Sequence, residues 1–108
     1  MQDSIEILLP AKWSYTEPNL EATCRIDKQR GRVDLTLEKT GQTFVDVLEV
    51  KRWAVGKLST PTTAEEFLAA AATRLPGYQV TVRWTTSTHG PITVSTCDEE
   101  INDERSPD

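Results

Sequence analysis

Residues 62–86 read TTAEEFLAAAATRLPGYQVTVRWTT, and this segment decides the fold of the chain. Its first half predicts a helix whose two ends are both marked in the sequence. Thr63 can cap the first turn, and Glu66 follows it at the three-residue spacing of a capping box. At the other end, Pro76 cannot continue a helix, and Gly77 permits a left-handed exit.

The two halves of this segment together predict a helix packed on a sheet. The helix has one apolar face, which consists of Phe67, Leu68, Ala71, Ala72 and Leu75. The alanines are small, so the helix can lie close to a flat surface. The second half supplies that surface, because Val80, Val82 and Trp84 alternate with polar residues at the period of a half-buried strand.

A β-hairpin is predicted upstream, from two runs of alternating apolar and polar residues. The apolar positions of these runs are Leu20, Ala22, Cys24, Ile26, Val33, Leu35 and Leu37. We expect the turn between the runs at residues 28–31, with Gly31 in a positive-φ conformation.

Shorter patterns assign the remaining segments. Residues 5–9 predict a short edge strand, and residues 11–19 predict an ordered loop whose aromatic side chains pack on the body of the protein. Residues 92–96 predict the last strand, which follows a turn at residues 87–91. The segment at residues 44–58 fits two structures, because its apolar spacing favours a helix whereas its valines favour a strand.

These elements predict one α+β domain at residues 1–97, followed by an acidic, flexible tail at residues 98–108. A length of 108 residues suits a single domain. If residues 44–55 are helical, the order of elements is β-β-α-α-β-β. We then expect an antiparallel sheet with the helices on one face.

The acidic residues concentrate in the tail. The chain carries 17 acidic and 12 basic residues, and residues 98–108 hold six of these acids and one of these bases. The rest of the chain is therefore balanced in charge. A neutral body argues against nonspecific binding of nucleic acid, which needs a basic surface. The tail is interpreted either as a solvated end or as an interaction segment.

Cysteine content and hydropathy favour a cytoplasmic protein. Cys24 and Cys97 are too few for a secreted disulfide scaffold, so both thiols are expected to be free. The chain begins with acidic residues rather than with the basic start of a signal peptide. No apolar run reaches the length of a membrane span. Without a Cys-x-x-Cys pair or paired histidines, no metal site is predicted.

Cys24 is the candidate nucleophile of the sequence. A nucleophilic thiol needs partial exposure and a partner that stabilises the thiolate. The nearest candidates along the hairpin are Arg25, Asp27 and Asp34. The alternative interpretation is a structural thiol on the apolar side of its strand.

Three other side chains are candidates for a binding site. Glu65 and Glu66 begin the central helix, where carboxylates favour the helix dipole and a ligand role is the second interpretation. His89 is the only histidine, and it lies in a turn, where a solvated side chain is the simpler interpretation.

Four short motifs accompany this order of elements. They are EATCRID at residues 21–27, EVKRWA at residues 49–54, AEE at residues 64–66 and THGPI at residues 88–92. With them the chain resembles the 7-cyano-7-deazaguanine reductases of queuosine synthesis and their archaeal amidinotransferase relatives. Those proteins have the tunnelling fold, a β-β-α-α-β-β unit whose copies join their sheets into barrels.

This resemblance implies a cytoplasmic homo-oligomer that binds a purine- or pterin-like base between its subunits. Cys24 would attack a nitrile carbon and form a thioimide, with Asp27 or Asp34 as the proton donor. Glu65 would hold the base, because one carboxylate can accept the two adjacent donors of a guanine-like edge. Glu66 and His89 would belong to the same substrate site, since they fall in the matching motifs.

The resemblance also implies a cofactor, but its motif is incomplete. Glu49 and Lys51 match the first pair of the family's NADPH-binding motif, whereas Arg52 and Ala54 replace the serine and the second lysine. Amidine-type transfer is therefore favoured over reduction by NADPH. Two other functions stay open from the residues alone. One is a non-enzymatic interaction or accessory protein, of a virus for example, and the other is a pseudoenzyme subunit that keeps the fold and pocket.

Overall fold

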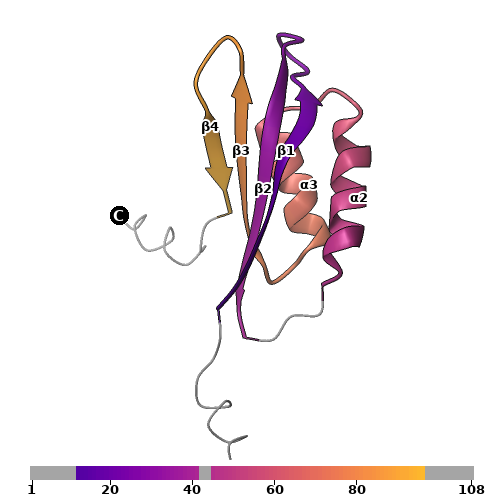
Figure 1. Cartoon of the computed structure of the whole chain (residues 1–108), viewed down its shortest axis with the longest axis vertical. Helices are drawn as coiled ribbons and strands as arrows, with labels where there is room; N and C mark the ends of the chain where they lie inside the picture. The colour runs from indigo at the N-terminus through magenta and orange to yellow at the C-terminus, as the bar shows by residue number, and fades with distance from the viewer. Residues whose placement is uncertain (1–11, 42–44, 97–108) are drawn as a thin grey trace, which may run out of the picture.

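The structure is a computed structural model that describes residues 12–41 and 45–96 (Figure 1). The strand predicted at residues 5–9 lies outside the described residues, as do Cys97 and the acidic tail predicted at residues 98–108.

The described chain forms a four-stranded antiparallel sheet with two helices on one face (Figure 1). The elements are β1 (Lys12–Thr23), β2 (Arg30–Thr40), α2 (Val47–Leu58), α3 (Ala64–Arg74), β3 (Gln79–Thr86) and β4 (Ile92–Ser95). The strands lie in the order β1-β2-β3-β4, so β1 and β4 form the two edges of this sheet. The predicted α+β class and the β-β-α-α-β-β order are confirmed.

The first strand begins at Lys12, so the loop predicted at residues 11–19 is wrong from that residue onward. The register of β1 against β2 shifts between Glu17 and Leu20, which is the mark of a β-bulge. Within the bulge, Asn19 takes a left-handed conformation with a φ of 59°.

The bulge explains why the sequence indicated a loop. It changes which alternate residues face the helices, from Trp13 and Tyr15 before it to Leu20 after it. If the alternation that begins at Leu20 is extended back toward Lys12, it does not fall on Trp13 and Tyr15. The sequence pattern therefore does not reveal the strand before the bulge. The predicted packing of the two aromatic side chains is confirmed, because Trp13 and Tyr15 both contact the core.

The turn between β1 and β2 also differs from the prediction. Lys28 takes the left-handed conformation, with a φ of 64°, so the positive φ expected at Gly31 is wrong. Gly31 instead lies in β2, opposite Thr86 of β3. A Cβ atom at Gly31 would lie 2.3 Å from the carbonyl oxygen of Thr85. Ile26, expected on the apolar face, is 73% exposed in the loop.

The segment that fitted both a helix and a strand is helical from Val47 to Leu58. Asp46 caps it, because its Oδ1 accepts hydrogen bonds from the amides of Leu48 at 3.0 Å and Glu49 at 3.4 Å. The buried residues of α2 are Val50, Ala54 and Leu58, one on each successive turn.

The helix that organises the fold has the ends that the sequence predicted. The Thr63 hydroxyl accepts from the amide of Glu66 at 3.1 Å, and the Glu66 carboxylate accepts from the amide of Thr63 at 3.2 Å. This is the expected capping box. After the helix, Gly77 has a φ of 91°, which is the predicted left-handed exit.

The core lies between the sheet and the helices. Its completely buried large side chains are Phe67, Leu35, Leu37, Val33, Val80 and Val82. Trp53 of α2 stacks on Phe67 of α3, with 5.6 Å between the ring centroids. The opposite face of the sheet is polar, and Thr16 and Thr36 join their hydroxyls across it at 3.0 Å. Among the described residues, neither helix is long and apolar enough to cross a membrane.

Candidate functional site

Cys24 lies just after the edge strand β1, where hydrogen bonds fix its backbone on both sides. Its amide donates to the carbonyl of Gln29 at 2.9 Å, and its carbonyl accepts from the amide of Lys28 at 3.0 Å. An isolated parallel bridge joins Cys24 to Thr62, and the amide of Arg25 donates to the Thr62 carbonyl at 2.8 Å. The segment that leads into α3 therefore positions the candidate nucleophile.

The thiol of Cys24 is half-buried, and Asp27 lies beside it. The thiol is free and packs partly against the core. A hydrogen bond from the amide of Gln29, at 3.0 Å, is the largest cause that lowers the pKa of Asp27, and a hydrogen bond from the Cys24 thiol adds to it. Because this pKa is lowered, the carboxylate of Asp27 is ionised at neutral pH, and its oxygens act as hydrogen-bond acceptors for the thiol.

His89 belongs to the same end of the sheet. It lies in the turn between β3 and β4, where its Nδ1 donates to the carbonyl oxygen of Gly90 at 2.6 Å. The electrostatic interaction with His89 lowers the pKa of Asp27 further, by less than the hydrogen bonds from Gln29 and Cys24 do. The structure thus brings Asp27, which the sequence offered as a partner of Cys24, to the same end of the sheet as His89, which the sequence proposed separately.

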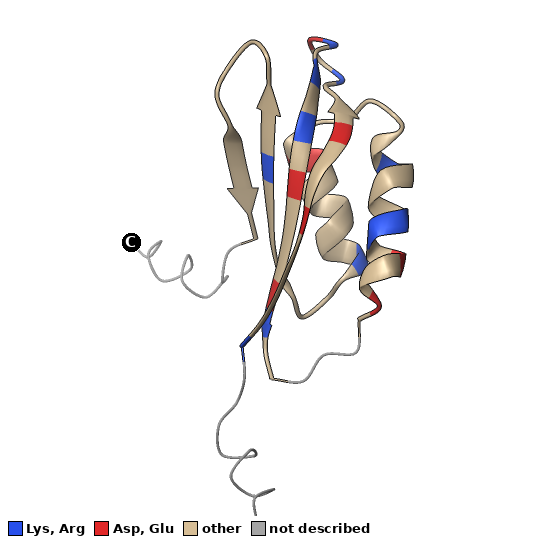
Figure 2. Cartoon of the chain, in the orientation of Figure 1, with Lys and Arg blue, Asp and Glu red and all other residues tan. Residues whose placement is uncertain are grey.

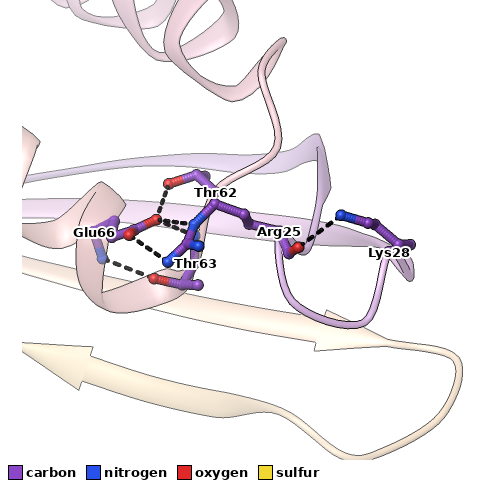
Figure 3. A network of polar contacts seen from close by, with 5 residues as sticks. All are labelled: Arg25, Lys28, Thr62, Thr63 and Glu66. Atoms are coloured by element: carbon purple, nitrogen blue, oxygen red, sulfur yellow. Dashed lines mark hydrogen bonds and ion pairs between the residues drawn. The ribbon is translucent and has the colours of Figure 1, made fainter.

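Arg25 and Glu66 tie the loop after β1 to the start of α3 (Figure 3). The guanidinium donates through Nη2 at 2.7 Å and through Nε at 3.1 Å to the two carboxylate oxygens. The Thr62 hydroxyl also donates to Glu66, at 3.2 Å. The hydrogen bond from Arg25 is the largest cause that lowers the pKa of Glu66, and Glu66 raises the pKa of Arg25. Glu66 is therefore engaged in holding the loop.

The other two acids proposed for the site lie in different surroundings. Asp34 is on the polar face of β2, where it accepts from the amide of Asn19 at 2.8 Å. It is Asp27, and not Asp34, that contacts the thiol of Cys24. Glu65 is exposed in the first turn of α3, and its carboxylate forms no hydrogen bond or ion pair with any residue in the described ranges.

The two residues matched to a cofactor motif each have a partner within the chain. Glu49 pairs with Arg74 of α3 at 3.7 Å, and Lys51 pairs with Glu17 of β1 at 3.6 Å. The Tyr15 hydroxyl donates to the same Glu17 carboxylate. Both predicted cofactor residues therefore help to connect α2 with its neighbours in the chain.

A cavity of about 510 Å³ opens beside the Cys24 loop. Its walls come from β1, from the facing ends of β2 and β3, and from the end of α2. The charged and hydroxyl-bearing residues in these walls are Glu21, Thr23, Arg30, Arg32, Ser59, Thr85, Thr86 and Ser87. Sequence reasoning missed this cavity, because its walls are far apart along the chain. The only available signal was the two-residue spacing of Arg30 and Arg32, which places both on one face of a strand.

No metal centre is built from the residues at 12–41 and 45–96, where no group of three or more His, Cys, Asp or Glu side chains could hold an ion. Comparisons with protein-family models, with curated proteins and with solved structures find no match to this chain. The function therefore has to be argued from the chemistry of the site.

Proposed function

We propose that this chain is a tunnelling-fold-like homo-oligomer that binds a purine- or pterin-like base at the Cys24 end of its sheet. Its chemistry would be the addition of the Cys24 thiol to the nitrile carbon of a 7-deazaguanine ligand. The observation that carries the proposal is the pairing of a half-buried, accessible thiol with an ionised carboxylate, Asp27, at the end of a sheet edge.

The chemical step balances with the groups at hand. Asp27 accepts the proton of the thiol, and the thiolate sulfur forms a bond to the nitrile carbon. One bond of the carbon–nitrogen triple bond becomes a lone pair on nitrogen, which then takes the proton from Asp27. The product is a thioimide, and nothing leaves the ligand.

The position of Cys24 favours a site shared between copies. β1 and β4 are the edges of the sheet, and an edge strand presents backbone groups that can pair with another chain. Thr62 already pairs with this edge at Thr23 and Arg25, so a second copy would pair with β1 before Thr23 and would end beside the Cys24 loop. Closure of such pairs into a ring would give the barrel that the resemblance implies.

Glu65 is the better carboxylate for holding the base. It is exposed at the start of α3, whereas Glu66 is occupied by Arg25 and by the capping box. The segment from Thr62 to α3 also carries the backbone bridge to Cys24, so Glu65 and the thiol belong to neighbouring parts of the chain.

Reduction by NADPH is less favoured than amidine-type transfer. The two residues that match the cofactor motif, Glu49 and Lys51, form ion pairs with Arg74 and Glu17. Binding of a dinucleotide through Lys51 would require that the pair with Glu17 be broken.

The proposal is tested by mixing the protein with 7-cyano-7-deazaguanine and measuring its intact mass. A thioimide adds the whole mass of the nitrile, because the addition has no leaving group. Cys24→Ala should abolish the adduct, and Cys97→Ala, which removes the second thiol of the chain, should leave it unchanged. Asp27→Asn should slow adduct formation by about 100-fold or more, which is the usual effect of removing a positioned acid or base.

Absence of an adduct in the wild-type chain would remove the covalent version of the proposal. The packing of Cys24 against the core favours the second candidate, a non-enzymatic interaction protein in which this cysteine is structural. That candidate predicts slow alkylation of Cys24 by iodoacetamide in the native state. Alkylation as fast as that of the unfolded chain would contradict it.

A further inference from the structure

The cavity beside the Cys24 loop has a polar, positively charged wall that the proposed chemistry does not use. Arg30 and Arg32 are two residues apart on β2, so their side chains leave the same face, with Cα atoms about 7 Å apart. Figure 2 shows basic residues at the end of β2 nearest the loop. By sequence these are Arg30 and Arg32, which precede Asp34, the first acidic residue of the strand.

Neither guanidinium is occupied within the part of the chain that the structure describes. Of the arginines in the described ranges, Arg25 and Arg74 form ion pairs, whereas none joins Arg30 or Arg32 to a carboxylate. The two arginines face Thr23 and Thr85 across the sheet, because Arg30 is in register with Thr23, and Arg32 with Thr85. Two planar, multi-donor cations beside two hydroxyls form a set of hydrogen-bond donors in one wall of the cavity.

Two features of the cavity disfavour the binding of an anion, and the effect of each is small. Glu21 is the cross-strand partner of Arg32, and it reduces the formal charge of the wall to one positive. The carbonyl end of α2 also reaches the cavity, but its carbonyl oxygen at Gly56 already accepts from the hydroxyl of Ser59 at 2.6 Å. The balance of charged groups therefore favours an anionic ligand.

We infer that this cavity binds a small phosphorylated molecule, with its phosphate held by Arg30 and Arg32. A phosphate offers more acceptor oxygens than a carboxylate does, and it suits two guanidinium groups and two hydroxyls at once. The volume of about 510 Å³ is that of a metabolite pocket. Five hydroxyl-bearing residues also line the cavity, so we expect the rest of the ligand to carry hydroxyl groups, as a sugar phosphate does. The inference does not depend on the thiol chemistry proposed above.

The test is a titration of the full chain with ribose 5-phosphate, followed by amide chemical shifts in two-dimensional NMR. Ribose is the matched probe without the phosphate. We expect saturable shifts at the amides of Thr23, Gly31 and Thr86 with ribose 5-phosphate, and none with ribose. This measurement needs no substitution, so it does not depend on whether a variant folds.

Substitutions then assign the phosphate contacts. Arg30→Gln and Arg32→Gln should each weaken ribose 5-phosphate binding by about tenfold or more, which is the loss of a charge-assisted hydrogen bond. Arg83→Gln is the control, because Arg83 is also an exposed arginine of a strand without an ion pair in the described residues, and it does not line the cavity. It should change the affinity by less than about twofold, the effect of one screened surface charge.

Three results would overturn the inference. They are an absence of saturable shifts with ribose 5-phosphate, an equal affinity for ribose, and an Arg83→Gln variant that weakens binding as much as Arg32→Gln does. The last result would mean attraction by net charge rather than a built site.

Discussion

A single glycine decides how closely two central strands approach beside the proposed phosphate cavity. Gly31 lies where β2 passes the end of β3, and a Cβ atom there would meet the carbonyl oxygen of Thr85 at 2.3 Å. Its backbone does not need the left-handed conformation, so the requirement for glycine comes from the neighbouring strand. This contact joins residues more than fifty positions apart, which is why local sequence patterns suggested a turn glycine instead.

We predict that Gly31→Ala lowers the free energy of unfolding by about 2 kcal/mol, because overpacking against a backbone atom forces the strands to shift. Gly56→Ala is the matched control. Gly56 is an exposed glycine inside α2, and nothing lies within 4 Å of its added Cβ atom. This control should be stabilised by about 0.5–1 kcal/mol. Urea unfolding of the two variants checks both signs, and equal effects would contradict the close approach.

The titration of Tyr15 makes the free energy of unfolding depend on pH in the alkaline range. Burial, followed by the hydrogen bond to Glu17, raises its pKa from 10.0 to about 12. A folded state with the higher pKa holds the proton more tightly than the unfolded state does. The contribution of Tyr15 is therefore complete below pH 10, and it is lost as pH rises through the interval from 10 to about 12.

Tyr15→Phe should accordingly make the free energy of unfolding fall less steeply between pH 10 and pH 12. Tyr78→Phe removes the other tyrosine of the chain and is the comparison variant. Chemical unfolding at a series of pH values gives the three slopes. A Tyr15→Phe variant with the wild-type slope would show that Tyr15 titrates alike in the two states.

At the scale of elements, α3 and its capping box are the most local feature of the fold. The Thr63 and Glu66 side chains exchange hydrogen bonds with each other's amides, and Glu66 also binds Arg25 from the loop after β1. The same carboxylate therefore begins the helix and anchors the loop that carries Cys24. Because the capping box needs residues only three apart, the sequence alone could predict it.

Thr63→Ala should lower the free energy of unfolding by about 1 kcal/mol, the usual cost of losing an N-cap side chain. Thr63→Ser keeps the hydroxyl and should stay within about 0.5 kcal/mol of the wild type. Thermal unfolding of both variants measures the difference between them. If alanine and serine cost the same, the cap does not contribute to the stability of α3.

Other elements could be predicted less completely, for reasons of geometry. The bulge at Glu17–Leu20 changes the inward face of β1, and a change of phase hides a strand from a search for simple alternation. Residues 47–58 have both helical spacing and strand-forming valines. Their helix depends on the Asp46 cap and on the packing of Trp53 against Phe67, which is a contact between elements.

The candidate site was predictable in part. Alternation and motif spacing singled out Cys24, Asp27 and His89, and the fold brings all three to one end of the sheet. Spacing could not choose between Asp27 and Asp34, because the choice depends on the loop that turns Asp27 back toward the thiol. Spacing also could not predict the ion pair between Arg25 and Glu66, because these residues meet only in the folded chain.

At the scale of the whole molecule, the sheet formed by residues 12–41 and 45–96 has one covered face and two edge strands. The helices cover one face of the sheet (Figure 1). That face is apolar, and the opposite face is polar. β1 and β4 end the sheet on either side, with Cys24 directly after β1. Pairing of β1 with β4 of the next copy would continue the sheet and would complete the site at the junction.

The mass of the protein in solution tests this central claim most directly. A single chain has a mass of 12.1 kDa. Native mass spectrometry, with light scattering after size exclusion as a second method, should find a closed assembly of several copies at micromolar concentration. A species of 12.1 kDa that persists as the protein is concentrated would contradict the shared site, and with it the proposed tunnelling-fold function.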